Sequence, residues 1–139
     1  MEKTVVLVKP DGVNKRVIGK IMTYLEDAGF KLSAGKFIRL TDDIIDRWYA
    51  HHKDKSFFPD LKKFMMETPV MAMVWEGEGV VAKVREICGP TDSLKAPKGT
   101  IRGDLGTDIQ HNVVHASEDE SNAKREIGLL FSQEEIISY

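Results

Sequence analysis

The sequence predicts a fold built on one open sheet of four strands, with helices between the strands packed mainly on one face. Two observations lead to this prediction. Short β-branched or alternating segments recur four times along the 139 residues, and each is followed by apolar residues at helical spacing. Strands that alternate with helices in this way favour a layered sheet. The order of the elements does not decide which strands pair.

The first part of the chain contains two predicted strands and a helix between them. Residues 4–8 are continuous and β-branched, as in a central strand buried on both faces. The segment Lys9-Pro10-Asp11-Gly12 ends this strand. Residues 17–28 carry apolar side chains at helical spacing, and Gly29 closes that helix. Residues 30–40 alternate loosely and predict the second strand.

The middle of the chain predicts three helices and a third strand. Thr41 is a suitable N-cap for a helix that continues through Tyr49. Pro59 suits the first turn of a short helix. Residues 70–75 form an apolar run bounded by proline and glycine, which predicts the third strand. A further helix is expected over residues 79–87.

The last part of the chain begins with a long segment that has no regular period. Residues 91–111 show no clean hydrophobic spacing, and connections of that length are usually functional or disordered. Residues 112–115 predict the fourth strand, and residues 119–130 predict the final helix. No repeat, linker or low-complexity run interrupts the chain, so we expect one domain over residues 1–139.

Composition excludes several classes of function. The formal net charge of −2 argues against a strongly basic nucleic-acid surface. Cys88 is the single cysteine, so intramolecular disulfides and cysteine-based zinc sites are excluded. The first residues lack the basic, apolar and small-residue segments of a signal peptide. No apolar stretch approaches the roughly 20 residues that span a bilayer. We therefore expect a soluble, cytoplasmic protein.

A single histidine at a strand end is the first candidate for chemistry. His115 ends the β-branched run that starts at Asn112. A neutral imidazole keeps a free lone pair on one ring nitrogen and can act as a nucleophile, a general base or a metal ligand. Glu126 is a candidate to orient the other ring nitrogen. The simpler alternatives are a half-buried histidine that bonds its neighbours and a plain surface glutamate.

Cations at the ends of elements favour a site for phosphates. The chain has no glycine-rich phosphate loop, so side chains would have to hold a phosphate. Lys9 ends the first strand, Arg85 lies in the helix after the third strand, and Arg102 lies in a glycine-flanked loop. A guanidinium group can donate two parallel hydrogen bonds to a pair of phosphate oxygens, and lysine supplies a point charge. Each cation alone is more often a solvated surface charge, but together with a histidine they favour binding.

Two adjacent aromatics, Phe57 and Phe58, lie at a break between helices. Neighbouring side chains cannot readily face the same way. One ring is therefore expected to be exposed, and an exposed ring can stack on a base.

Together these residues resemble the nucleoside diphosphate kinase family over essentially the whole chain. The matching motifs are Val8–Val13, Phe57–Pro59, Met73–Gly77, Gly99–Asp104 and Asn112–His115. The resemblance implies transfer of the γ-phosphoryl of a nucleoside triphosphate, typically ATP, to nucleoside diphosphates by a ping-pong mechanism through phosphohistidine. It also implies an α+β fold, a ferredoxin-like sandwich with a four-stranded antiparallel sheet, assembled as a homo-oligomer of four or six chains.

The resemblance also implies roles for individual residues. The catalytic set that it implies is His115 as nucleophile with Glu126, Ser117, Lys9 and Arg102. The residues that match phosphate or sugar contacts are Lys9, Tyr49, Arg85, Thr91, Arg102 and Asn112. Phe57 matches the aromatic that stacks on the base, with Leu61 and Ile109 lining the same slot. Mg²⁺ is implied to be held mainly by nucleotide phosphates and water, with no protein ligand.

Three residues near the histidine depart from the family pattern. Ala116 stands where glycine is common, Glu118 where aspartate is usual, and His111 where arginine is more frequent. In addition, strict alternation along a strand would point Asn112 and His115 to opposite faces. If both contact nucleotide, the fourth strand must begin irregularly at Asn112.

Two functions of other classes stay open at this point. One is a regulatory module on the same sandwich that binds nucleotide without chemistry. The other is a single-stranded RNA-binding domain, although no strand carries the paired aromatics that such a sheet uses, and the charge is slightly acidic.

Overall fold

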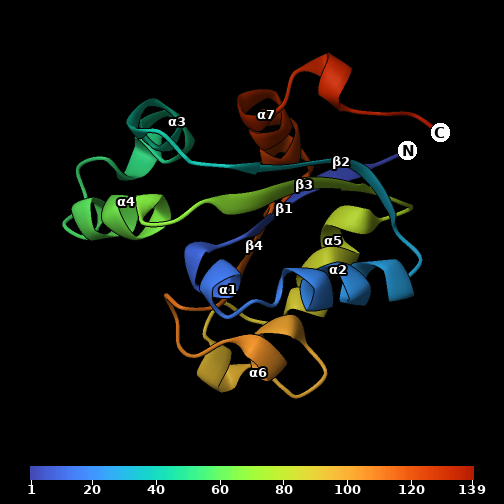
Figure 1. Cartoon of the computed structure of the whole chain (residues 1–139), viewed down its shortest axis with the longest axis horizontal. Coiled ribbons are helices and arrows are strands. Elements are labelled where there is room, and N and C mark those ends of the chain that lie inside the picture. The colour runs from blue at the N-terminus through green and yellow to red at the C-terminus, as the bar shows by residue number, and fades with distance from the viewer.

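A four-stranded antiparallel sheet in the order β2-β3-β1-β4 forms the centre of the molecule (Figure 1). A computed structural model describes residues 1–139. The strands are β1 (Lys3–Val8), β2 (Lys31–Ile38), β3 (Val70–Glu76) and β4 (Val114–Ala116). The strand order and the antiparallel pairing confirm the ferredoxin-like sheet that the family resemblance implied.

Seven α-helices connect and flank the strands. They are α1 (Pro10–Asn14), α2 (Ile18–Asp27), α3 (Asp42–Trp48), α4 (Phe58–Met66), α5 (Val80–Cys88), α6 (Ile101–Leu105) and α7 (Glu120–Leu130). Short 3₁₀ turns occur at Ala50–His52, Ser93–Lys95 and Gln133–Glu135. None of the helices combines the length and the apolar character needed to cross a bilayer.

Two of these helices were not predicted from the sequence. The helix α1 starts at Pro10, directly after β1. We expected Pro10 to end the strand, but a proline also suits the first position of a helix, because its φ is already close to the helical value. The helix α6 has five residues, too few for a periodic pattern, and the Thr100 hydroxyl caps it by accepting from the Gly103 N–H at 3.0 Å.

Helices cover both faces of the sheet, which corrects the expectation that they pack mainly on one face. In Figure 1, α2 and α5 lie below the sheet, and α3 and α7 lie above it. Val6 and Val8 of β1 pack with residues of α2 and α5, whereas Val5 and Leu7 pack with residues of α3, α4 and α7. Because side chains alternate along a strand, an apolar β1 needs a covering layer on each face.

The strand β4 begins at Val114, two residues later than predicted, because the backbone at Val113 is left-handed. Val113 has a φ of 61°, which is rare for a β-branched residue. The Val114 N–H donates to the Asn112 carbonyl at 2.8 Å and closes a γ-turn around Val113. Val113 therefore packs in the α2 and α5 layer, while His115 pairs with Leu7, whose side chain lies in the opposite layer. An irregular start at this point is what the sequence predicts if Asn112 and His115 share one site.

The turn at Val113 is held by the segment that follows β1. The Asp11 carboxylate, through Oδ2, accepts from the Val113 N–H at 3.0 Å. The Lys9 N–H donates to the Val113 carbonyl at 2.9 Å. A Cβ at Gly12 would lie 2.8 Å from the same carbonyl oxygen, so only glycine fits there. Strained backbone costs about 1–3 kcal/mol, and a buried bond to a carboxylate offsets a similar amount.

We predict that Asp11→Ala lowers the free energy of unfolding by about 1–3 kcal/mol, because the buried Val113 N–H loses its acceptor. Urea denaturation measures the change. Asp11→Asn is the matched control, since its amide oxygen still accepts a hydrogen bond, and it should lose less than half as much. Equal losses in the two variants would show that the bond to Val113 is not what Asp11 contributes.

Candidate active site

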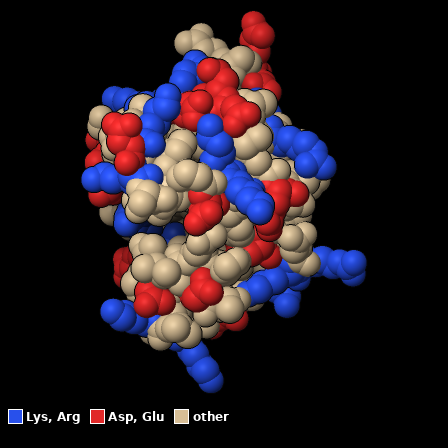
Figure 2. Space-filling view, turned by 90° about the vertical axis from the view of Figure 1, so that its left-hand side faces the viewer, with Lys and Arg blue, Asp and Glu red and all other residues tan.

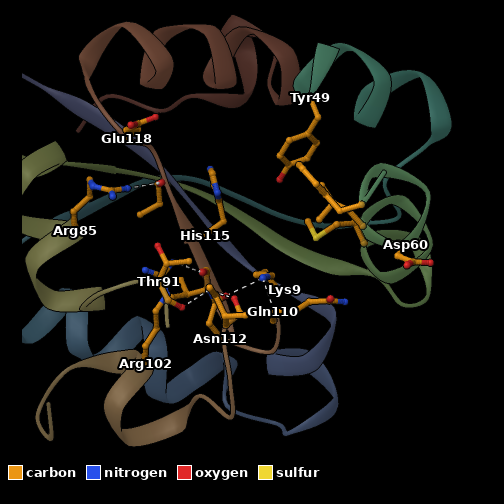
Figure 3. A pocket seen from close by; sticks show the side chains of 16 residues that line it. Lys9, Tyr49, Asp60, Arg85, Thr91, Arg102, Gln110, Asn112, His115 and Glu118 are labelled. Carbon is orange, nitrogen blue, oxygen red and sulfur yellow. Dashed lines mark hydrogen bonds between the residues drawn. The ribbon is translucent and has the colours of Figure 1, made fainter. Parts of the chain in front are cut away.

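A cavity of about 820 Å³ lies beside β4, within the size range of small-molecule sites (Figure 3). Its lining includes His115 and every predicted nucleotide-binding residue: Lys9, Tyr49, Phe57, Leu61, Arg85, Thr91, Arg102, Ile109 and Asn112. Strands, helices and loops that are far apart in the sequence thus bring the predicted residues together. Ser117 and Glu126 are not in the lining; both are bonded to one another next to His115. The cavity also includes Asp60, Gln110 and Glu118, for which the sequence analysis had predicted no binding role.

His115 is anchored through one ring nitrogen. Its Nε2 lies 3.2 Å from Oε1 and 3.1 Å from Oε2 of Glu126. An ionised carboxylate only accepts hydrogen bonds, so Nε2 carries the proton and Nδ1 keeps its lone pair. No protein group hydrogen-bonds Nδ1. The sequence-based candidate for orienting the histidine therefore contacts it directly, and the free nitrogen belongs to a side chain that lines the cavity.

Glu126 is almost fully buried and is satisfied by three donors. Besides His115, Ser117 Oγ donates to Oε1 at 2.6 Å, and Trp48 Nε1 donates to Oε2 at 2.7 Å. Ser117 Oγ in turn accepts from the Val5 N–H at 3.2 Å. Burial acts to raise the pKa of Glu126, but the hydrogen bonds from His115, Ser117 and Trp48 hold it below the usual value. Glu126 is therefore an ionised partner for the imidazole.

Trp48 is the member of this network that was not predicted from the sequence. It lies on the apolar stripe of α3 and is 1% exposed. A tryptophan at helical spacing is indistinguishable in sequence from an ordinary core residue. No sequence signal links it to a glutamate in α7, 78 positions away.

Lys9 belongs to a polar cluster on the opposite wall of the cavity. Its Nζ donates to Asn112 Oδ1 at 2.8 Å and to the Gln110 carbonyl at 2.7 Å. The Asn112 amide nitrogen donates to the Thr91 carbonyl at 2.9 Å, which ties the β4 start to the loop after α5. Burial lowers the pKa of Lys9 to about 8, with Arg102 adding to this effect and Asp11 opposing it. The lysine therefore loses its charge within the range of mildly alkaline solutions.

Arg102 is held rigidly, and Arg85 is not. Arg102 is 8% exposed and donates to the carbonyls of Gly89 at 2.9 Å and Val114 at 2.8 Å. Burial lowers its pKa from the usual value, although a guanidinium stays charged at neutral pH. Arg85 is exposed, and its one contact, to the Ala116 carbonyl, is 3.5 Å long. One guanidinium is thus fixed in the cavity wall, and the other is free to turn toward a ligand.

Exposed apolar side chains form a slot at the rim of the cavity. Phe57 is 49% exposed and Phe58 is 6% exposed, which confirms that one ring of the pair faces outward. Ile109 is 62% exposed, and Leu61 lines the cavity with it. Burial raises the pKa of Tyr49, so its hydroxyl is a neutral hydrogen-bond donor at this wall.

The three departures from the family pattern have different structural consequences. Ala116 lies within β4, outside the left-handed region, so a glycine is not required there. Glu118 lines the cavity as a carboxylate near His115. His111 is not in the lining; its Nδ1 lies 3.1 Å from Asp108 Oδ1, and its ring packs edge-on against Phe64.

Charge on the molecular surface is mixed. On the face drawn in Figure 2, lysine and arginine side chains are interspersed with aspartate and glutamate. Neither positive nor negative charge dominates this face. Such a surface does not favour the broad phosphate-backbone contacts that nucleic-acid binding uses.

Comparison with known proteins gives one consistent result. Residues 2–136 match the family model described as nucleoside diphosphate kinase. A nucleoside diphosphate kinase of Natronomonas pharaonis is 50% identical, covering 99% of this chain and 91% of the relative. The structure of the Halobacterium salinarum enzyme in complex with CDP superposes with a TM-score of 0.96 at 46% identity, covering 99% and 92% of the two chains. A family member from Babesia bovis gives 0.97 at 42% identity, covering 100% and 94%.

Proposed function

Because this chain belongs to the nucleoside diphosphate kinase family and is a phosphotransferase, we propose that His115 carries the phosphoryl group between its two nucleotide substrates. One observation supports this most strongly. His115 lines the cavity, its Nε2 is held by Glu126, and its Nδ1 has no protein partner. That arrangement leaves one nitrogen lone pair for a nucleophilic attack.

The reaction divides into two displacements at one site. In the first, Nδ1 forms a bond to the γ-phosphorus, the bond from phosphorus to the β,γ-bridging oxygen breaks, and the nucleoside diphosphate leaves with that electron pair. In the second, a terminal oxygen of another diphosphate attacks the phosphorus and the bond to Nδ1 breaks. One cavity therefore serves donor and acceptor in turn, as in ping-pong kinetics.

Glu126 stabilises the charged ring. As Nδ1 shares its lone pair with phosphorus, the imidazole becomes cationic while Nε2 keeps its proton. The carboxylate that accepts from Nε2 lies within 3.2 Å, where an opposite charge is favourable in a largely buried setting. Ser117 supports the carboxylate from the other side. No proton has to move during the transfer.

Cationic side chains bind the phosphates and stabilise the transferring group. Phosphoryl transfer depends mainly on positioning and on charge stabilisation of the three equatorial oxygens. Lys9, Arg85 and Arg102 supply this charge from the cavity lining, and Asn112, Thr91 and Tyr49 supply polar contacts to phosphate or sugar. The fixed guanidinium of Arg102 is suited to the transition state, because its geometry does not have to reorganise.

The slot of Phe57, Leu61 and Ile109 holds the base. Stacking tolerates any base, since each has a π-face, and this supports broad nucleotide specificity. The relative from Halobacterium salinarum, described in complex with CDP, supports a nucleoside diphosphate as a ligand of the same cavity here. The exposed ring of Phe57 is the surface on which we place the base.

Mg²⁺ is proposed to arrive with the nucleotide. No group of three or more histidine, cysteine, aspartate or glutamate side chains is positioned to hold a metal, so the phosphate oxygens would supply most ligands, as Mg²⁺ sites commonly do. The carboxylate of Glu118 in the lining fits contact with a metal-bound water. The ion would neutralise phosphate charge during the transfer.

We further propose that residues 1–139 form a single domain and that the protein is a homo-oligomer of four or six chains in the cytoplasm, where nucleotide pools lie. The continuous sheet supports one domain. Phe37 on the edge strand β2 is 57% exposed and Leu94 is 80% exposed, and such apolar side chains favour association. Light scattering coupled to size exclusion distinguishes the assemblies.

We predict that incubation with γ-labelled ATP and Mg²⁺ leaves acid-labile label on the protein after nucleotide is removed, and that an added nucleoside diphosphate takes up this label. His115→Ala should retain none. His111→Ala is the matched control, because that imidazole is outside the cavity, and it should be labelled like the wild type. Bound nucleotide with no label on the wild-type protein would instead indicate a non-catalytic binding module.

Arg102→Lys should slow phosphorylation of His115 by about 10- to 100-fold while the Kd for nucleoside diphosphate changes less than threefold. A lysine cannot make both bonds, to the Gly89 and Val114 carbonyls, that fix the charge in the cavity wall, and that fixed charge acts mainly in the transition state. Single-turnover quench kinetics and calorimetric titration measure the two quantities. A variant that loses affinity at an unchanged transfer rate would contradict a transition-state role for Arg102.

The kcat/KM for nucleoside triphosphate should decline above about pH 8, because the pKa of Lys9 in the free, unphosphorylated enzyme is about 8 and deprotonation removes its charge. Lys9→Arg should extend the plateau past pH 9, since a guanidinium stays charged. Lys15→Arg, at an exposed lysine outside the cavity, is the control and should keep the wild-type profile. A wild-type plateau that extends to pH 10 would rule out Lys9 as the group that titrates.

A further inference from the structure

Trp48 contacts both members of the His115–Glu126 pair without reaching the cavity. Its indole N–H donates to Glu126 Oε2 at 2.7 Å. Its ring meets the His115 imidazole edge to face, with 5.1 Å between ring centroids and an interplanar angle of 89°. The side chain is 1% exposed and does not line the cavity. Trp48 therefore touches the proposed nucleophile and its carboxylate from the side away from substrate.

The Trp48 bond fixes the orientation of the Glu126 carboxylate. Ser117 donates to one oxygen and Trp48 to the other, so the carboxylate plane is set by donors on both sides. The terminal torsion of a glutamate is otherwise broad. With a single donor, the carboxylate would be free to turn and would no longer present both oxygens to Nε2. Two donors keep it directed at the histidine.

The ring contact fixes the imidazole itself. Rotation of the histidine by 180° about its second side-chain torsion would exchange Nδ1 with Cδ2 and Nε2 with Cε1, which would break the bond from Nε2 to Glu126 and turn Nδ1 to the other side of the ring. A T-shaped aromatic contact is favourable and specific in geometry, and the bond to Glu126 favours the same ring position. The indole and the carboxylate together therefore keep Nε2 inward and Nδ1 available.

The helix that carries Trp48 is itself tied to the helix that carries Glu126. Arg125 in α7 donates to the Trp48 carbonyl at 3.2 Å and, at 3.5 Å, to the Arg47 carbonyl. The ring of Tyr49, which lines the cavity, stacks on the Trp48 indole at 5.6 Å. These contacts therefore keep the indole in a fixed position relative to Glu126.

We propose that Trp48 is a positioning residue for the phosphoryl transfer, which acts through its indole N–H on Glu126 and through its ring on His115. The proposal rests on His115 as phosphoryl carrier. The indole does not touch substrate, so its loss should lower kcat and leave the KM for nucleotide unchanged. It should also make the buried Glu126 easier to protonate, which moves the acid limb of activity to higher pH.

Few other groups could produce that pH change. The remaining titratable or charged side chains around the shallow pocket between α3 and α7 are Tyr49, His51, His52, His115, Glu118 and Arg125. Of these, His115 alone hydrogen-bonds Glu126. The Trp48 N–H is therefore the donor whose removal changes the carboxylate most directly while leaving His115 intact.

Trp48→Phe tests the proposal, because it keeps an aromatic ring and removes the N–H. We expect kcat to fall about tenfold, as for a lost bond to a charged group, with KM within twofold and the acid limb shifted upward. Trp75→Phe is the matched control: Trp75 is fully buried in β3, and its Nε1 has no hydrogen-bond partner. The control should keep the wild-type acid limb and lose less than threefold in kcat.

A double-mutant cycle with Glu126→Gln tests whether Trp48 acts through the carboxylate. Trp48→Phe should cost less than twofold further in that background. A full tenfold additional loss, or a Trp48→Phe variant that matches Trp75→Phe in kcat and pH profile, would overturn the proposal. Wild-type protein that never becomes phosphorylated would instead contradict His115 as carrier, so the two failures are distinct.

Nitrogen-15 NMR of the intact protein provides a test that needs no folded variant. The chain has two tryptophans, so two indole N–H resonances are expected. Phosphorylation by ATP with Mg²⁺ should shift the Trp48 resonance, because its acceptor gains a cationic neighbour, and leave the Trp75 resonance in place. An unmoved Trp48 resonance on fully phosphorylated protein would overturn the proposal.

Discussion

The left-handed turn at Val113 is the constraint on which the site depends. A regular β4 would send Asn112 and His115 to opposite faces of the sheet. The γ-turn, held by the Asp11 carboxylate and the Lys9 N–H, instead brings both residues into the lining of one cavity. Asn112 then binds Lys9 and the Thr91 carbonyl. The wall that carries Lys9 and Asn112 and the wall that carries His115 thus meet at a single strained residue, Val113.

A second constraint is the burial of Glu126. An isolated carboxylate in this position would be costly, and the chain satisfies it with His115, Ser117 and Trp48. These donors come from β4, the segment after it and α3. The same bonds keep Glu126 ionised, define which imidazole nitrogen carries the proton, and lock α3 and α7 against the sheet. Stability and the proposed chemistry therefore depend on the same contacts.

Periodic and capped elements could be predicted from the sequence, and irregular ones could not. The apolar spacing of α2 and the Thr41 cap, whose hydroxyl accepts from the Ile44 N–H, were recognisable locally. The helices α1 and α6 are too short to show a period, and a β-branched valine gives no signal for a left-handed turn. The charged side chains and His115 could be predicted from the sequence as candidate site residues, and they line the cavity. Trp48 gave no signal, because its hydrogen bond is defined only once α3 and α7 meet.

We propose that Nδ1 of His115, and not Nε2, receives the phosphoryl group, because Glu126 holds Nε2. The most direct test is phosphorus NMR of protein labelled with nitrogen-15 in its histidine rings, recorded after incubation with ATP and Mg²⁺. We expect one phosphohistidine signal, coupled to Nδ1 and absent from His115→Ala. Phosphorus bound to Nε2, or to a side chain other than His115, would contradict it.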